Sequence, residues 1–315
     1  MAVSNTDCAV HCQFCRPYNK TMNTSTLKLS ALTSVLALSA VTANAVNSTR
    51  QPINTRFAQT QDAISIEATA STFTEIELEE ADDFDGWTSG AEIVVPLQFL
   101  SDSTSNMQVR VFIPTYTDGD AKTTDPELPE PVGTKIDIDG NGGLYDYMTG
   151  QLEHQLFNEK DDGFNAAYTI GWGKVYESLD TTTSDKDLYN HSGKVVLAGI
   201  KYDRPISIFG NESQLLLNGG IRSYYDTDDL HPDDKDEFTW ADLKGAIIFE
   251  QMGDHILPVL ELTYLGGFGD YDELLLKPEV IVPFCDNASI KLGGILSLSN
   301  DGNQGGFAGS VSYGF

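Results

Sequence analysis

Residues 306–315 read GFAGSVSYGF, and in this stretch large side chains alternate with small ones. Phe307, Val311, Tyr313 and Phe315 occupy odd positions, while the even positions hold only Ala, Ser and Gly. Successive side chains of a β-strand point to opposite faces, so this period of two predicts a strand with one apolar face. The same alternation dominates the chain from residue 63 onward.

Twelve segments with this period can be drawn, and each is close to the ~10 residues that a tilted strand needs to cross a bilayer. They cover residues 64–78, 89–100, 107–117, 143–157, 164–177, 194–203, 213–225, 239–252, 256–267, 273–284, 289–298 and 306–315.

The connections between these segments alternate in length. The odd-numbered ones are mostly long and acidic, and they include residues 79–88, 118–142, 178–193 and 226–238. The even-numbered ones are mostly short, and they include residues 101–106, 158–163, 253–255 and 285–288. This alternation predicts an all-β fold over residues 63–315, a transmembrane antiparallel up-and-down β-barrel with long acidic extracellular loops and short periplasmic turns.

The composition agrees with that fold class. The 315 residues carry a formal charge of −28, which argues against nucleic acid as a partner because such binding relies on clustered Lys and Arg. A mean hydropathy of −0.22 is too polar for a helical membrane protein. A barrel with alternating strands keeps its average hydropathy low, as does a soluble acidic β-protein.

An apolar run near the start predicts export. Residues 29–41 (LSALTSVLALSAV) follow Lys28 and lead to Ala43-Asn44-Ala45, the pattern of a secretory signal peptide. Because Met22 gives this signal an ordinary length, we expect a signal over residues 22–45 and a mis-assigned upstream segment over residues 1–21. The polar residues 46–62 are expected to form a flexible periplasmic lead-in, which either plugs the lumen or hangs free.

Cleavage after Ala45 would remove the first three cysteines. Cys8, His11, Cys12 and Cys15 resemble half of a zinc site, but no second ligand pair follows them. Only Cys285 would remain, so the mature chain is expected to hold no intrachain disulfide.

The C-terminal strand carries a resemblance to a known class. A last strand that ends in Phe315, with Tyr313 two residues before it, resembles the assembly signal of Gram-negative outer-membrane β-barrels. The resemblance implies a place in the outer membrane and contact with the barrel-assembly machinery, membrane lipid and lipopolysaccharide. Residues 255–299 weakly resemble porin-like barrels that take up aromatic or other small organic compounds.

A barrel of about twelve strands is expected to enclose a narrow lumen. Alternation points one set of charged side chains inward as pore-lining candidates: Arg110, Lys174, Lys201, Arg222, Asp242, Lys244, Glu250, Glu261, Lys277, Glu279 and Lys291. Glu67, Glu92 and Asp203 fall on the same face. Two interpretations stay open: the basic residues ease the passage of an anion, or they neutralise the acids of the lumen.

One motif has metal-ligand spacing. Asp137, Asp139, Asn141 and the following glycine match the start of a calcium loop, although Met148 stands where the bidentate acid belongs. Calcium is therefore the sole cofactor that the sequence suggests.

These features predict a passive outer-membrane channel for small solutes that is not an enzyme. A closed structural or surface-binding barrel, acting in adhesion or envelope integrity, is the alternative. A third hypothesis is an outer-membrane enzyme with His191 and His231 in its outer loops. The sequence leaves the solute undecided, as well as the choice between monomer and homo-oligomer.

Overall fold

The computed structural model describes residues 49–76, 81–124, 131–140, 147–174, 179–181, 192–228, 235–253, 256–267 and 271–315. The predicted signal peptide, the upstream segment and its cysteine cluster lie outside these residues.

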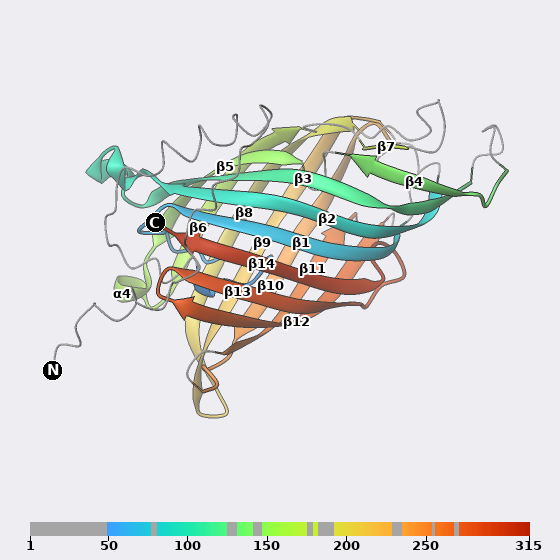
Figure 1. The fold of residues 1–315 in the computed structure, drawn as a ribbon. Coiled ribbons are helices and arrows are strands. Elements are labelled where there is room, and N and C mark those ends of the chain that lie inside the picture. Colours follow the sequence, from blue (N-terminus) through green and yellow to red (C-terminus); the bar gives the residue numbers. More distant parts are fainter. Residues whose placement is uncertain are drawn as a thin grey trace, which may run out of the picture. The chain divides into compact units, whose positions relative to one another are not determined.

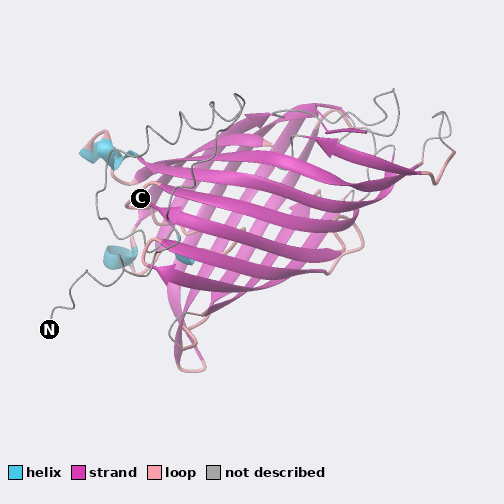
Figure 2. Ribbon diagram, in the orientation of Figure 1, coloured by secondary structure: helices cyan, strands magenta, loops and turns pink. Residues whose placement is uncertain are grey.

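The described chain is almost entirely β-structure (Figures 1 and 2). Its strands are β1 (Ser65–Ile76), β2 (Ala81–Pro96), β3 (Met107–Thr123), β4 (Lys135–Gly140), β5 (Met148–Phe157), β6 (Asn165–Lys174), β7 (Leu179–Thr181), β8 (Ser192–Ile208), β9 (Asn211–Asp228), β10 (Phe238–Ile248), β11 (Leu257–Gly266), β12 (Asp272–Cys285), β13 (Ala288–Ser297) and β14 (Gly305–Gly314). Short helical turns, among them α4 (Glu159–Asp162), lie in the connections.

Twelve of the described strands close into a ring of antiparallel pairs. The order runs from β2 through β1, β14, β13, β12, β11, β10, β9, β8, β6 and β5 to β3, and the pairing of β2 with β3 completes the ring. The remaining two strands lie outside it, since β4 pairs with the end of β3 and β7 pairs with β4. The predicted twelve-stranded antiparallel barrel is confirmed.

Several stretches predicted as loops are partly strand, since β4 lies within residues 118–142 and β7 within residues 178–193. Strand β2 starts at Ala81 instead of residue 89, and β3 runs on to Thr123 instead of residue 117. The reason is continued pairing of β2 with β3, where Lys122 contacts Asp83, and of β3 with β4, where Lys135 lies 2.6 Å from Asp120. Acidic sequence therefore did not by itself mark a loop.

The two faces of the barrel wall differ in polarity. Large apolar side chains cover the outside, as Phe307 (75% exposed), Ile200 (68%) and Leu292 (58%) illustrate. Charged and small polar side chains fill the inside, among them Glu67, Lys201 and Lys291. An apolar exterior around a polar interior is the reverse of a water-soluble protein and suits strands that face lipid. No helix among the described residues is long and apolar enough to cross a membrane.

The two ends of the barrel are distinguished by the termini. We call the end where β1 begins and β14 finishes the terminal end, because Ser65 pairs with Gly314 there. It carries the tight connections at residues 209–210 and 286–287. The opposite end, where β8 begins and β9 finishes, is called the distal end.

The polar lead-in does not hang free at the terminal end. Residues 51–62 lie inside the barrel and are mostly buried, with Thr55 wholly inaccessible and Arg56 nearly so. The sequence suggested flexibility because the segment has no apolar stripe. Its partners are instead polar groups of the lumen, which such a composition satisfies well.

Candidate functional site: the lumen

An alternating chain of cations and anions follows the inner wall. Lys291 of β13 contacts Glu67 of β1 at 2.7 Å, and Glu67 lies 3.7 Å from Arg56 of the lead-in. Arg56 lies 3.2 Å from Glu92 of β2, which also pairs with Arg110 of β3. Glu153 of β5 binds Arg110 at 2.8 Å and also pairs with Lys201 of β8, the last member. We name these seven residues the ion chain. Each buried charge therefore has an opposite neighbour, the condition under which burial is tolerated.

The lead-in is held mainly through its backbone. Six of its N–H groups donate to side-chain oxygens of the wall, and the pairs are Ile53 to Glu279 (3.1 Å), Thr55 to Glu261, Arg56 to Asn218 (2.7 Å), Ala58 to Asp203 (2.6 Å), Thr60 to Gln155 (2.8 Å) and Gln61 to Gln108 (2.9 Å). Asn218 also returns a hydrogen bond to the carbonyl of Arg56 at 2.8 Å. Because these acceptors come from β3, β5, β8, β9, β11 and β12, the segment crosses the lumen from one side to the other.

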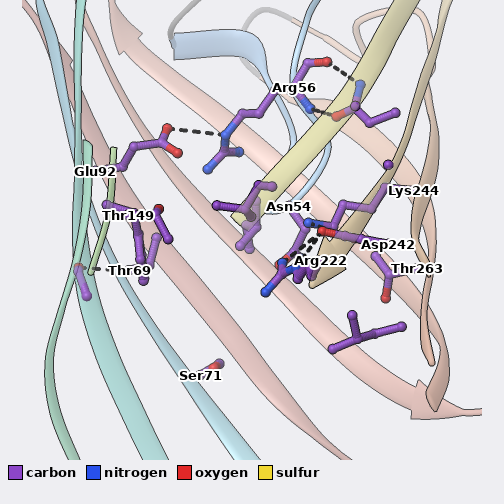
Figure 3. A pocket seen from close by; sticks show the side chains of 18 of the residues that line it. Asn54, Arg56, Thr69, Ser71, Glu92, Thr149, Arg222, Asp242, Lys244 and Thr263 are labelled. Atoms are coloured by element: carbon purple, nitrogen blue, oxygen red, sulfur yellow. Dashed lines mark hydrogen bonds and ion pairs between the residues drawn. The ribbon is translucent and has the colours of Figure 1, made fainter. Parts of the chain in front are cut away.

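A second charged group lies on β9 and β10. Arg222 donates to Asp242 from both Nε and Nη2, each at 2.8 Å, and Lys244 lies 3.2 Å from the other carboxylate oxygen. All three side chains keep some accessible surface. Figure 3 shows them together with Asn54 and Arg56 of the lead-in.

Aromatic and aliphatic side chains fill the distal half of the lumen. The rings of Trp240 and Tyr271 stack at 4.6 Å with an angle of 9° between their planes, and Tyr224 packs edge-on against Trp240. We call this the aromatic cluster; it reaches across to Phe73 of β1 and Phe84 of β2, whose rings are 4.8 Å apart. Its buried members exclude water from this level of the barrel.

A cavity of about 360 Å³ lies between the lead-in and the aromatic cluster (Figure 3). Asn54 and Arg56 of the lead-in line one side, and Phe73 and Tyr147 of the aromatic cluster line another. Small residues make much of its wall: Thr69, Ser71, Gly90, Thr149, Thr169, Gly199, Gly220 and Ala308. The free volume therefore exists because the wall side chains at this level are short.

Comparison with solved structures places this architecture among known barrels. The transport unit of the autotransporter AIDA-I from Escherichia coli superimposes with a TM-score of 0.53 at 11% identity, covering 86% of this chain and 95% of that chain. The fold is that of a bacterial outer-membrane β-barrel. With its apolar exterior, this barrel is a protein of the outer membrane.

Two further likenesses are more distant. An outer-membrane channel from Pseudomonas putida F1 has a TM-score of 0.48 at 12% identity, covering 84% of this chain and 98% of that one. The translocator domain of the autotransporter NalP from Neisseria meningitidis has a TM-score of 0.45 at 10% identity, covering 92% and 97%. No protein-family model and no curated protein sequence matches this chain. At these identities the likeness concerns the fold alone.

Most of the predicted pore-lining residues lie inside the barrel. Those that do are Arg110, Lys201, Arg222, Asp242, Lys244, Glu261, Lys277, Glu279 and Lys291. Lys174 is exposed and shares the outward face of β6 with Ile170 and Trp172. Glu250 is exposed beyond the end of β10, where the strand has already stopped.

Sequence reasoning missed three members of the site. Arg56 lies in a segment with no periodic pattern, so alternation gave it no direction. Glu153 belongs to the predicted strand with the least regular pattern, 143–157, which the structure shortens to β5. Trp240 lies near the start of a predicted strand, a position typical of an aromatic girdle at the membrane interface, but it is buried in the aromatic cluster.

The calcium motif is placed on a strand. Asp137 and Asp139 belong to β4, where they pair with Asp120 and Asp118 of β3; Asn141 lies outside the described residues. A hydrogen bond with Asp120 raises the pKa of Asp137. Among the described residues, no three His, Cys, Asp or Glu side chains lie close enough together to hold a metal ion.

Tyr313 of the assembly signal lies on the lipid-facing side of β14 with Val311, and Phe315 follows the strand. His191 and His231, the residues of the enzyme hypothesis, lie outside the described part of the chain.

Proposed function

We propose that this barrel is a channel for small solutes whose lumen is closed by its own N-terminal segment. The observation that carries the proposal is the way in which the lead-in is held inside the barrel. Residues 53–61 are bound by hydrogen bonds and ion pairs and not by strand pairing, so the segment is able to leave without breaking the ring.

The cavity supports the same proposal. Removing residues 51–62 would join its 360 Å³ to the space that the segment now fills, which reaches the terminal end of the barrel. The wall exposed in this way carries the charges of the ion chain and of Glu261, Glu279 and Asp203. A wall of fixed charges and short polar side chains is what the passage of hydrated solutes requires.

The direction of the closure follows from the fold. In outer-membrane barrels the short turns lie on the periplasmic side and the long connections outside. We therefore assign the terminal end, with the lead-in, to the periplasm and the aromatic cluster to the outer half. In this proposal the barrel works without catalysis and without a cofactor, in contact with outer-membrane lipid.

The test is conductance in planar bilayers. We expect the chain from Val46 onward to give rare current steps, and a variant lacking residues 47–62 to give frequent ones. A variant in which residues 51–62 are replaced by Gly and Ser at equal length is the matched control, because it keeps the segment but removes its side chains. If folded deletion protein gives no steps, the barrel is not a channel and the closed structural barrel is the correct hypothesis.

A further inference from the structure

Lys277 differs from the other basic residues that face the lumen. Its side chain lies on β12, is 9% exposed and borders the cavity. Arg56, Arg110, Lys201, Arg222, Lys244 and Lys291 each have an acidic partner. Among the described residues, none provides an oxygen in ion-pair or hydrogen-bond contact with the ammonium group of Lys277. A buried ammonium group with no acceptor in contact is costly, so this position calls for a ligand that brings an acceptor to it.

The neighbouring acids explain why Lys277 has no partner. Glu261 is its cross-strand neighbour on β11, and Glu279 is two residues along β12. Glu261 accepts hydrogen bonds from Asn54 at 2.8 Å and from Thr55, while Glu279 accepts one from Ile53. The lead-in therefore engages the acids of this wall and leaves the cation beside the cavity.

On the other side of the same corner two cations share one carboxylate. Arg222 and Lys244 share the single carboxylate of Asp242, and Thr263 of β11 lies opposite Lys244 across the strand pair. These four side chains and Lys277 all border the cavity. The corner formed by β9, β10, β11 and β12 thus lines the cavity with three cations and two acids, Asp242 and Glu273, and Glu273 already accepts a hydrogen bond from the backbone of Asn303 at 2.9 Å.

The rest of this corner is apolar. Leu275 lies beside Thr263 in the neighbouring strand, and Leu265 and Ile295 line the same cavity. A volume of about 360 Å³ is at the small end of the range found for small-molecule sites, about 300–1,000 Å³. The ligand must therefore be small, with one charged end and one apolar end.

We propose that this corner binds a small organic carboxylate. The carboxylate lies between Lys277 and Lys244 within reach of the Thr263 hydroxyl, and a short aliphatic or ring-shaped body contacts Leu275 and Leu265. Carboxylate oxygens supply the missing acceptor for the Lys277 ammonium group. The role of this site rests on the proposed function, because the carboxylate would be the class of solute that the channel passes. Binding itself requires only the cavity.

The test is calorimetric titration of the full mature barrel, with its lead-in, in lipid nanodiscs. The probe is hexanoate, and 1-hexanol is the uncharged comparison. We expect hexanoate to bind at least tenfold more tightly than 1-hexanol. Lys277→Gln should weaken hexanoate binding about tenfold or more, the usual effect of losing a hydrogen bond to a charged group, whereas Lys277→Arg should retain it. Lys174→Gln removes a lysine from the outer face and is the matched control.

Three results would overturn the proposal: no heat of binding for hexanoate, equal affinity for hexanoate and 1-hexanol, or equal affinity in the wild type and Lys277→Gln. Inorganic phosphate binding as tightly as hexanoate would overturn the apolar part of the site. A heat-dependent mobility shift on gels verifies that each variant is folded. Calorimetry measures binding and planar-bilayer recording measures conductance. Failure of the binding proposal can therefore be distinguished from failure of the channel proposal.

Discussion

We expect Arg56→Gln to loosen the lead-in, because Arg56 is the residue of the described lead-in whose side chain forms ion pairs with the wall. It lies between Glu92 at 3.2 Å and Glu67 at 3.7 Å, and all three side chains are buried. Arg56→Gln removes the cation of the lead-in while its backbone contacts with Asn218 remain. Removing one member of a buried ion pair costs ~3–5 kcal/mol.

That cost is reduced here because both acids keep another partner. Lys291 remains 2.7 Å from Glu67, and Arg110 remains paired with Glu92. We therefore expect the docked state of the lead-in to lose about 2–3 kcal/mol. This corresponds to a shift of about 30-fold to 150-fold in the ratio of docked to undocked segment.

The assay is the open probability of single channels in planar bilayers. Arg56→Gln should raise it toward that of the protein lacking residues 47–62. Arg50→Gln is the matched control, because Arg50 belongs to the same segment but is exposed. If Arg56→Gln and Arg50→Gln give the same open probability while the deletion opens the barrel, the side chain of Arg56 does not hold the segment in place.

Three further predictions concern stability, measured by urea-induced unfolding in lipid vesicles unless stated otherwise. Trp240→Ala leaves a void in the aromatic cluster and should cost ~3–5 kcal/mol; a loss under 1 kcal/mol would mean that the cluster is not packed. Lys291→Met leaves Glu67 with a single, longer ion pair and should cost ~3–5 kcal/mol, most of which the added substitution Glu67→Gln should restore; a double variant no more stable than the single one would contradict the pairing. Gly86→Ala places a methyl group 2.2 Å from the carbonyl oxygen of Asp118 and should lower the folded fraction on refolding gels, whereas Gly150→Ala, with nothing within 4 Å, should not.

The fold was predictable because a barrel wall separates two environments. Lipid outside and a polar lumen inside impose a period of two on every crossing strand, and the sequence carries that period openly. Strand ends were less predictable. At this end of β2 the acids Asp82, Asp83 and Asp85 are exposed and only Phe84 turns into the aromatic cluster, so the strand continues without a regular apolar alternation.

The sequence predicted which charged side chains point into the lumen, but not which groups they pair with. Alternation pointed Glu67, Glu92 and Arg110 inward, yet it gave no sign that Arg56 completes their chain. Arg56 is near Glu67 and Glu92 in the sequence, but it belongs to a segment with no regular structure, and alternation gives such a residue no direction. The cavity was equally hidden, because it results from the short side chains of several strands at one level of the barrel.

The ion chain also bears on how the barrel is assembled. Glu67 belongs to the first strand and Lys291 to the last but one, and Ser310 of the last strand donates to the same carboxylate at 2.6 Å. These groups meet only when β1 joins β14, so an open sheet would hold Glu67 without two of its partners. Pairing of β1 with β14 therefore supplies the missing partners of Glu67. This stabilises the closed ring relative to an open sheet whose edge strands are apart.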